Sequence, residues 1–464
     1  MNVNPITRLD YPDPDVIRVE DTYYMVSTTM HFMPGCEILQ SFDLVHWEHA
    51  TYVYETLDHT DAQQLKSGQN IYGQGMWAAS LRYHEGRFYI CFVANDTRKT
   101  YLYTSEKIDG PWKKQLIEGF YHDGSLLFDE DGRNYIVYGN DEIWITELNE
   151  DLTAPKKDGL HRLLVSDHKN PELGYEGSHI QKINGYYYIF LIHSLRDRWM
   201  RTEACFYSDS LEGEFTGGDV LCDDRGYCGQ GVAQGGIVDT PDGKWYAMLF
   251  QDSGAVGRIP ILLPVTWKDH FPVFGQNGHV PEEIEVHSTR PGYIYQPLVG
   301  SDDFCNGLLP RWQFNHDPDP RYYHLDALQG TYTITTREVC TELTQAVNTL
   351  TQRMSYPSCA AEVTVDASAL KEGDVAGLCA LQSCYAAVGI TKHHGKYEVL
   401  MLDKKEDGIL DMTEGTVVES HQMDFRLEAD FCNMKDEARC YYRVNKGDWL
   451  PIGTVHKLYF KLDH

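Results

Sequence analysis

Five residues at equivalent positions of a repeated pattern carry the groups from which an acid–base site could be built. They are three carboxylic acids, one aromatic residue and one amide: Asp13, Asp123, Glu176, Trp77 and Gln234. Carboxylates crowded into one cleft repel one another, so at least one of them has a raised pKa and stays protonated near neutral pH. Cleavage of a glycosidic bond requires such a set, because one carboxylic acid protonates the leaving oxygen while a carboxylate acts on the anomeric side. The aromatic ring can cover the apolar face of a sugar, and the amide can bind sugar hydroxyls.

The equivalence of these positions comes from a repeated hairpin pattern. Five times the chain runs from an apolar stretch through a tight turn rich in Gly, Asp or Asn into a second stretch that contains tyrosine. The anchoring tyrosines are Tyr24, Tyr89, Tyr135, Tyr188 and Tyr246. Each member of the set lies twelve positions before its tyrosine, except that Asp13 lies eleven before because the first turn is one residue shorter. Asn-Gly and Asp-Gly between alternating apolar stretches are strong hairpin signals.

The elements that must position these residues are therefore short strands in five similar units. Successive tyrosines are 65, 46, 53 and 58 residues apart, which leaves room in each unit for a four-stranded sheet. We predict a five-bladed β-propeller over residues 1–290, in which the innermost strand of each blade lines a central channel. Equivalent positions then meet at one mouth of that channel. A β-sandwich of hairpins is the alternative fold, and the propeller is favoured because the repeat fixes residue position as well as composition.

The repeat stops near Pro281, and a second domain is predicted to follow it. Residues 282–300 contain several charges and two prolines, which we interpret as a linker. Residues 291–464 are predicted to be a C-terminal β-sandwich, because strand-like stretches such as 331–335 and 361–366 alternate with Gly and Asp turns and show little helical periodicity. The whole chain is thus predicted to be all-β.

Each site residue also has a purely structural interpretation. Asp13 precedes a proline, a pair that often marks only a turn. Asp123 and Glu176 are each followed by Gly and Ser and could end a turn or begin a strand, and Trp77 could belong to the core. The shared register of all of them favours catalysis, whereas the nearby Asp15 falls outside that register.

At these residues the sequence resembles glycoside hydrolase family 43. The matching phrases are Asp10-Tyr-Pro-Asp13-Pro, Trp77-Ala-Ala-Ser-Leu, Asp123-Gly-Ser-Leu-Leu-Phe-Asp, Tyr175-Glu176-Gly-Ser-His179 and Gln234-Gly-Gly-Ile-Val-Asp. The resemblance implies that Asp13 is the general base, that Glu176 is the general acid, and that Asp123 raises the pKa of the acid and orients it. It also implies inversion of configuration, for which the base and the acid should stand ~6.5–9.5 Å apart to admit a water molecule.

The same resemblance implies further sugar-binding residues. Trp77 matches a residue that lines the subsite of the terminal sugar, and Arg258 matches an arginine that reaches the sugar and the acid. Phe32 is expected as an additional wall of the pocket, and Gln234 as a ligand of hydroxyls. The phrases around Asp303 and at residues 348–353 resemble the concanavalin-like jelly roll that follows the propeller in xylosidases and arabinofuranosidases of the family, where a loop closes over the pocket.

One departure from the family concerns a metal ion. Many relatives have a histidine at the fifth-blade position, associated with a calcium ion on the axis, whereas this chain has Gln234. A structural calcium therefore stays an open alternative, and no cofactor or metal is predicted as required.

Together these features predict an exo-acting glycoside hydrolase whose partners are xylan- or arabinoxylan-derived oligosaccharides. The preferred product is terminal α-L-arabinofuranose, with β-D-xylose as a sugar that some relatives also release. A β-D-xylosidase, a retaining fructan-cleaving propeller and a carbohydrate-binding propeller without catalysis are the alternatives. Nucleic acid and anionic membranes are excluded as partners, because 69 acidic against 40 basic residues give a net charge of −29.

The expected location is cytoplasmic. The N-terminal residues lack the basic start and apolar stretch of a secretory signal. The twelve cysteines include no Cys-X-X-Cys pair, and we interpret them as unpaired thiols in a reducing compartment.

Overall fold

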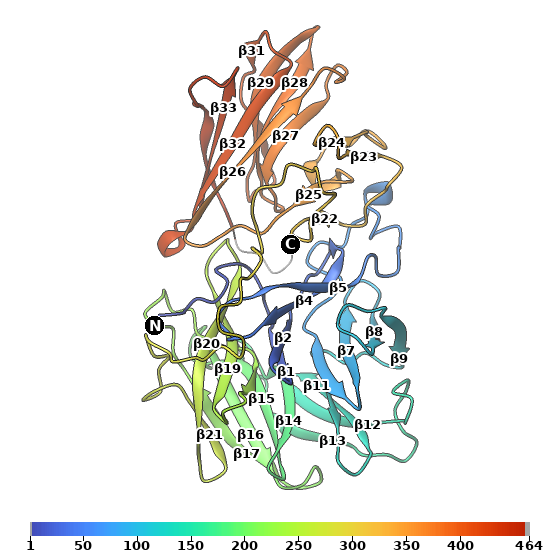
Figure 1. The fold of residues 1–464 in the computed structure, drawn as a ribbon, viewed down its shortest axis with the longest axis vertical. Helices are drawn as coiled ribbons and strands as arrows, with labels where there is room; N and C mark the ends of the chain where they lie inside the picture. Colours follow the sequence, from blue (N-terminus) through green and yellow to red (C-terminus); the bar gives the residue numbers. More distant parts are fainter. Residues whose placement is uncertain (1, 460–464) are drawn as a thin grey trace. The chain divides into compact units, whose positions relative to one another are not determined.

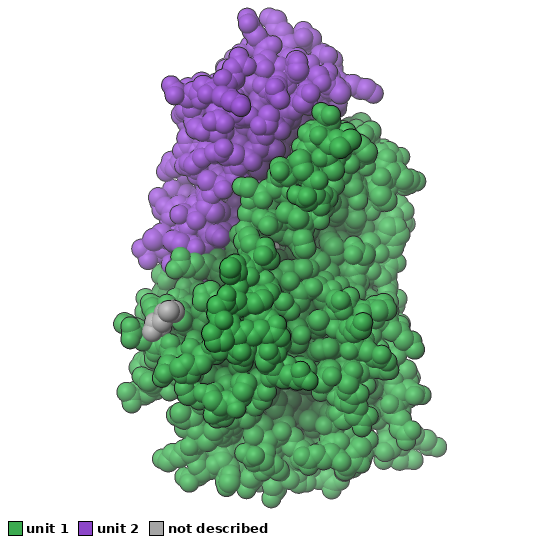
Figure 2. Space-filling model, in the orientation of Figure 1, with its two compact units in different colours: residues 1–252, 258–341, 345–353 green, residues 253–257, 342–344, 354–464 purple. Residues whose placement is uncertain are grey.

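The computed structural model describes residues 2–459 of the chain. These residues divide into two compact units, coloured separately in Figure 2. Unit 1 comprises residues 1–252, 258–341 and 345–353, and unit 2 comprises residues 253–257, 342–344 and 354–464. Over the described residues, no helix has both the length and the apolar character needed to cross a membrane.

Unit 1 contains five consecutive four-stranded antiparallel sheets, which follow one another in chain order in Figure 1 from blue through cyan and green to yellow. The first two sheets are β1 (Asp15–Val19), β2 (Thr22–Val26), β4 (Gly35–Ser41) and β5 (Glu48–Tyr54), then β6 (Ser80–His84), β7 (Arg87–Ala94), β8 (Lys99–Ser105) and β9 (Lys113–Ile117). The third is β10 (Ser125–Phe128), β11 (Asn134–Asn140), β12 (Glu142–Leu148) and β13 (His161–Ser166). The last two are β14 (Glu176–Ile183), β15 (Tyr186–Ser194), β16 (Arg201–Ser208) and β17 (Thr216–Leu221), then β18 (Gly236–Asp239), β19 (Trp245–Asp252), β20 (Arg258–Lys268) and β21 (Phe271–Phe274).

The first strands of the five sheets form a closed ring. Strand β1 neighbours both β6 and β18, and β10 neighbours both β6 and β14. The ring closes between β14 and β18, where the side-chain amide of Gln181 donates a hydrogen bond of 2.7 Å to the carbonyl of Ile237. The all-β propeller followed by a second β domain is thus confirmed as the fold class.

The predicted hairpins begin and end where their turn residues require. Asn184 and Gly185 between β14 and β15 both have positive φ, at 50° and 83°. A two-residue hairpin turn of this kind needs φ above zero at both positions, which Asn-Gly adopts readily. Ile183 pairs with Tyr186 directly across the turn. From this turn β14 runs to Glu176 at its opposite end, with a register shift between His179 and Glu176, which pairs with Ile192.

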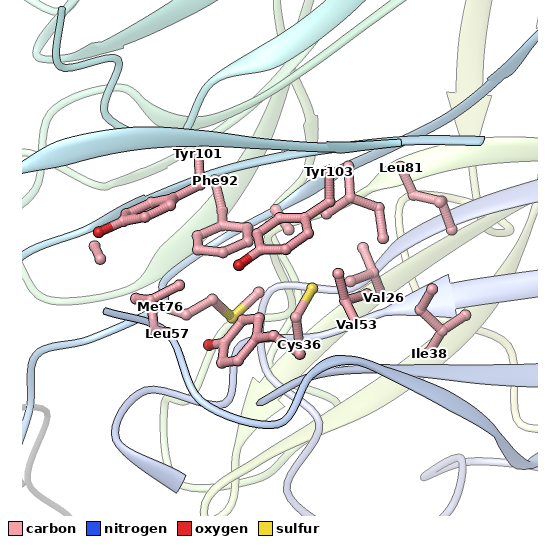
Figure 3. Packing of buried hydrophobic residues seen from close by; sticks show 14 of the residues in the cluster. Val26, Cys36, Ile38, Val53, Leu57, Met76, Leu81, Phe92, Tyr101 and Tyr103 are labelled. Atoms are coloured by element: carbon pink, nitrogen blue, oxygen red, sulfur yellow. The ribbon is translucent and has the colours of Figure 1, made fainter. Parts of the chain in front are cut away.

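Adjacent sheets pack face to face through apolar side chains. Figure 3 shows buried side chains of the first and second sheets packed against one another in one cluster. The buried members include Val26, Ile38, Val53, Leu81, Phe92 and Tyr101. Burying such side chains stabilises each by roughly 1.5–3 kcal/mol relative to exposure, so the sheets form a rigid support for the residues at the strand ends.

Residues 281–341 and 345–353 belong to unit 1, which therefore continues past the boundary predicted near residue 290. Three short strands form one sheet in the order β25 (Leu350–Thr351), β22 (Gln313–Asn315) and β3 (Phe32–Met33), and β23 (Tyr323–Asp326) pairs with β24 (Thr331–Ile334). The contacts that retain this segment include an ion pair of 2.9 Å between Arg353 and Glu37. These contacts are the reason that the compact unit extends to residue 353. The local sequence pattern does not indicate this extent, because pairing between segments far apart in the chain leaves no mark in it.

Unit 2 is a β-sandwich with two main sheets. One sheet contains β26 (Ser358–Asp366), β32 (Gln422–Asp430), β33 (Glu437–Val444) and β34 (Leu450–Lys457). The other contains β27 (Val375–Ala380), β28 (Ala386–His393), β29 (Lys396–Lys404), β30 (Leu410–Met412) and β31 (Thr416–Val418). Short 3-10 turns occur at η1 (Lys66–Gly68), η2 (Leu343–Gln345) and η3 (Cys432–Met434).

Candidate active site

The five residues of the predicted set all lie at the starts of the innermost strands. Glu176 is the first residue of β14, and the other four precede the first residue of their strand by two or three positions: Asp13, Trp77, Asp123 and Gln234. The structure therefore brings all five to the same edge of the ring. Asp13 and Asp123 both have a positive φ, at 52° and 48°, so the backbone takes the same unusual turn before both strands.

Asp123 and Glu176 are joined by a histidine. The Nε2 atom of His122 lies 3.2 Å from Oε2 of Glu176 and 3.4 Å from Oδ2 of Asp123. The amide of Asn140 donates a hydrogen bond of 2.9 Å to the same Glu176 oxygen, and the backbone N–H of Gly177 donates one of 2.9 Å to Asp123. Asp123 is buried, whereas the Glu176 side chain is 22% exposed, so Glu176 is the more accessible of these two acids.

Burial and charge set the protonation of this cluster. Burial raises the pKa of Asp123 to about 6, and the nearby charges of Glu176 and Asp13 act in the same direction, while His122 opposes them. The charge of Asp123 is the main cause that raises the pKa of His122 to about 9, with Glu176 contributing. His122 is therefore a cation at neutral pH, shared between two carboxyl groups.

Asp13 is held separately by an arginine and a hydroxyl. Its Oδ1 atom accepts a hydrogen bond of 2.9 Å from Arg258, and its Oδ2 atom accepts one of 2.6 Å from the hydroxyl of Thr28. Asp13, Arg258 and Thr28 are all buried. Both carboxylate oxygens are thus oriented by fixed donors, as a base that must point at one position requires.

Arg258 also connects Asp13 to aromatic side chains. Its guanidinium lies 5.5 Å from the ring centre of Trp77 and 5.3 Å from that of Phe250. The indole of Trp77 donates a hydrogen bond of 3.2 Å to the carbonyl of Gly73, which fixes the ring. The structure therefore places the predicted residues Trp77 and Arg258 together beside Asp13.

Phe32 and Gln234 each pack against a different neighbour. Phe32 follows Thr28 by four residues and packs against His31, with ring centres 4.2 Å apart. Gln234 lies against Gly177, because a Cβ atom placed on Gly177 would stand 2.1 Å from Cδ of Gln234. The sugar-binding roles of Phe32 and Gln234 stay predictions.

Sequence reasoning missed His122, Asn140 and Thr28 as parts of the site. His122 directly precedes Asp123, so its position in the chain could have identified it. Asn140 ends β11, the strand that pairs with β10, and the backbone N–H of the preceding Gly139 donates a hydrogen bond of 3.0 Å to the carbonyl of His122. Writing out the hairpin register would therefore have placed Asn140 beside the acids.

A structural calcium on the axis stays an open alternative, and two polar side chains that precede or begin the innermost strands, Gln234 and Asp15, already have packing or hydrogen-bond partners. Calcium takes about 6–8 oxygen ligands. Gln234 is packed against Gly177, and Asp15 already accepts hydrogen bonds from Arg82 at 2.8 Å and His179 at 3.0 Å. We therefore derive no catalytic step through a metal ion.

Among the described residues, one cluster has donor atoms close enough together to hold a cation. Its members are His122, Asp123 and Glu176, whose atoms all lie within 4.8 Å of one another. The protonated imidazole already supplies positive charge between the two carboxyl groups, so we assign this cluster to acid–base chemistry.

Comparison with known proteins gives this geometry a family context. A chain described as bifunctional GH43-CE from Bacteroides eggerthii superposes with a TM-score of 0.92 at 41% identity, covering 99% of this chain and 59% of that one. A β-xylosidase of Formosa agariphila is 27% identical over 86% of this chain and 76% of its own length. A non-reducing end α-L-arabinofuranosidase of Bacteroides ovatus is 24% identical over 88% of this chain and 79% of its own.

The family matches cover both parts of the chain. Residues 301–461 match the β-xylosidase C-terminal concanavalin A-like domain, which confirms the predicted character of the second domain. Residues 3–272, which carry all of the acids described above, match the glycosyl hydrolases of family 43. The chain therefore belongs to glycosyl hydrolase family 43 and is a glycoside hydrolase of the xylosidase and arabinofuranosidase type.

Proposed function

We propose that this chain is an exo-acting hydrolase that releases terminal pentoses from xylan- or arabinoxylan-derived oligosaccharides by a single displacement with inversion. One observation carries the proposal. Asp13 is oriented by Arg258 and Thr28, whereas Glu176 belongs to a separate cluster with Asp123 and His122. Two carboxyl groups in two different environments can take the two different roles that glycoside hydrolysis requires.

Asp13 is the general base in this proposal. Its two oxygens are fixed by donors from Arg258 and Thr28, so the remaining lone pairs point toward a defined position. A water molecule there gives up a proton to Asp13 as its oxygen attacks the anomeric carbon. The bond from that carbon to the leaving oxygen breaks in the same step, which inverts the configuration.

Glu176 is the general acid and protonates the leaving oxygen. Its side chain is partly exposed, and the amide of Asn140 holds one of its oxygens at 2.9 Å. Asp123 is a buried carboxyl group beside it, held by the backbone N–H of Gly177 at 2.9 Å. The Nε2 atom of His122 lies 3.2 Å from Glu176 and so orients the acid together with Asn140.

The preferred terminal sugar is α-L-arabinofuranose, and the α-L-arabinofuranosidase of Bacteroides ovatus supports this preference. A β-D-xylosidase as the main activity is the second candidate, because the relative from Formosa agariphila is named a β-xylosidase. Hydrolysis of an aryl arabinofuranoside and an aryl xyloside by one preparation separates the two. Proton NMR of the first-formed sugar tests inversion, since an inverting enzyme yields the opposite anomer.

Substitution of the two proposed catalytic acids tests the mechanism. Glu176→Gln should lower kcat by about 10²–10⁴-fold on oligosaccharides, the usual contribution of a general acid. It should retain much more activity on an aryl glycoside with a good leaving group, which needs little protonation. Asp13→Asn should lower both activities alike.

The same pair of variants identifies a wrong assignment. An equal loss on both substrates in Glu176→Gln would remove that residue from the role of acid. A wild-type chain that binds oligosaccharides but hydrolyses no aryl pentoside would favour the carbohydrate-binding alternative.

A further inference from the structure

Trp199 is an exposed aromatic residue at the edge of the ring that carries the acids. Its side chain is 43% exposed, and it lies in the turn between β15 and β16. The turn is closed by the backbone N–H of Leu195, which donates a hydrogen bond of 3.1 Å to the carbonyl of Met200. The hydroxyl of Ser194 accepts a second bond of 2.7 Å from the N–H of Met200. An exposed tryptophan is thus presented on a fixed turn.

Strand register places this turn next to Glu176. Glu176 pairs with Ile192 of β15, and Ser194 pairs with Arg201 two residues farther along. Because a strand rises about 3.3 Å per residue, the turn extends beyond Glu176 at the same edge of the sheet. In the proposed function Glu176 faces the leaving oxygen, and this turn is the segment that continues past Glu176 at that edge.

A continuous series of guanidinium groups and rings connects Trp199 to the proposed base. Arg201 lies 5.4 Å from the ring of Trp199 and 5.1 Å from the ring of Phe250. The guanidinium of Arg258 lies 5.3 Å from the centre of the same Phe250 ring and donates a hydrogen bond to Asp13. Arg201 is itself buried and bonds Asp252 at 3.1 Å, so it cannot move away from Trp199 freely.

We infer that Trp199 is a specificity-determining residue that stacks on the sugar of the leaving group. A lone exposed aromatic residue needs no functional explanation by itself. Here, however, the ring lies over a buried arginine, in a turn that extends past the proposed general acid. Tryptophan offers a large flat apolar surface with little conformational freedom, which suits the apolar face of a pyranose ring. The inference rests on the proposed function, since it assumes that Glu176 protonates the leaving group.

The test compares two substrates that share the terminal pentose and differ in the leaving group. One is a pentose-terminated xylo-oligosaccharide, and the other is the corresponding pentosyl fluoride, which has no sugar to stack. Trp199→Ala should lower kcat/KM on the oligosaccharide by about tenfold, the change expected from one aromatic contact, and leave the fluoride unchanged. Trp199→Phe should restore most of the loss.

A control variant removes an equally exposed aromatic residue elsewhere. Tyr83 is 44% exposed and lies at the far end of β6 from Trp77. Tyr83→Ala should leave both substrates unchanged. Equal losses on both substrates in Trp199→Ala, or no loss on either, would overturn the role of Trp199 while the wild-type activity upheld the proposed function. A wild-type chain inactive on both substrates would overturn the proposed function and this inference with it.

Discussion

His122 lies within ion-pair distance of both carboxyl groups of the acid cluster. Its Nε2 atom lies between Glu176 and Asp123, and the negative charge of Asp123 is the main reason that its pKa rises to about 9. The imidazole therefore partly cancels the negative field that Asp123 exerts on the acid. This arrangement lets a buried carboxyl group stay close to a second one without the full cost of like charges.

Removing His122 should change how stability depends on pH. The folded pKa of His122 is above its ordinary value of 6.5, so its contribution to stability is fully present below about pH 6.5 and is lost as pH rises through about 9. The melting temperature of the wild type should therefore fall more than that of His122→Gln between pH 7 and pH 10. Thermal unfolding followed by circular dichroism at several pH values measures this, and parallel curves would contradict it.

Gly177 should tolerate no side chain, because its backbone approaches Gln234. Its φ is 64°, and an added Cβ atom would stand 2.1 Å from Cδ of Gln234. Gly177→Ala should displace the N–H that bonds Asp123 and so lower kcat by about tenfold or more, in addition to the ~1–2 kcal/mol cost of the left-handed backbone.

Gly185 provides the matched control for this substitution. Its φ is 83°, but nothing lies within 4 Å of an added Cβ atom. Gly185→Ala should therefore lower stability by about 1–2 kcal/mol without changing kcat. Activity assays and urea unfolding of Gly177→Ala and Gly185→Ala measure kcat and stability in both variants. An equal loss of kcat in the two would show that backbone strain alone lowers kcat in Gly177→Ala.

At the scale of strands, the local sequence patterns predicted the hairpins but not the pairing of segments that are far apart in the chain. The turn residues and the alternating apolar positions placed the hairpins, and the shared register brought Asp13 and Glu176 to one edge. They could not predict pairing between distant segments, since nothing in residues 313–315 indicates that they pair with Phe32 and Met33. Thr28 was missed for a related reason, because its contact with Asp13 depends on how the chain turns after β2.

Arg353 shows how much such a distant contact contributes. It pairs with the buried Glu37 at 2.9 Å, lies 4.1 Å from the ring of Tyr11 and bonds the carbonyl of Asp10 at 2.8 Å. Arg353→Met would leave the buried Glu37 charge without its arginine and should lower the free energy of unfolding by about 3–5 kcal/mol.

An exposed arginine offers the comparison for Arg353. Arg321 bonds Asp319 at 2.7 Å, but its side chain is 75% exposed. Arg321→Met should change the free energy of unfolding by less than about 1 kcal/mol, as exposed ion pairs usually do. Urea unfolding measures both values, and a similar small effect for Arg353→Met would show that the buried pair contributes little net stability.

At the scale of the whole molecule, the acidic composition and the site agree. A net charge of −29 repels polyanions but imposes no barrier on uncharged oligosaccharides. Cations near the acids, namely Arg258 and His122, are held in ion pairs with Asp13 and with the Asp123–Glu176 pair. In the proposed function, charge therefore acts locally, by orienting the acids, and the binding of an uncharged oligosaccharide would depend on shape, hydrogen bonds and aromatic surface.

The extent of the catalytic unit gives the last prediction. A chain of residues 1–290 ends at the predicted domain boundary and lacks β22, β25 and Arg353, all of which pack on unit 1. It would expose Met33 along β3 and leave the buried Glu37 without Arg353. A chain of residues 1–353 keeps these contacts, although the loop 253–257 then lacks the rest of unit 2, to which it belongs. The longer chain should therefore be soluble and unfold cooperatively, whereas the shorter one should melt at a clearly lower temperature or aggregate. Calorimetry of the two purified chains decides the matter, and equal melting temperatures would place the end of the stable unit near residue 290 after all.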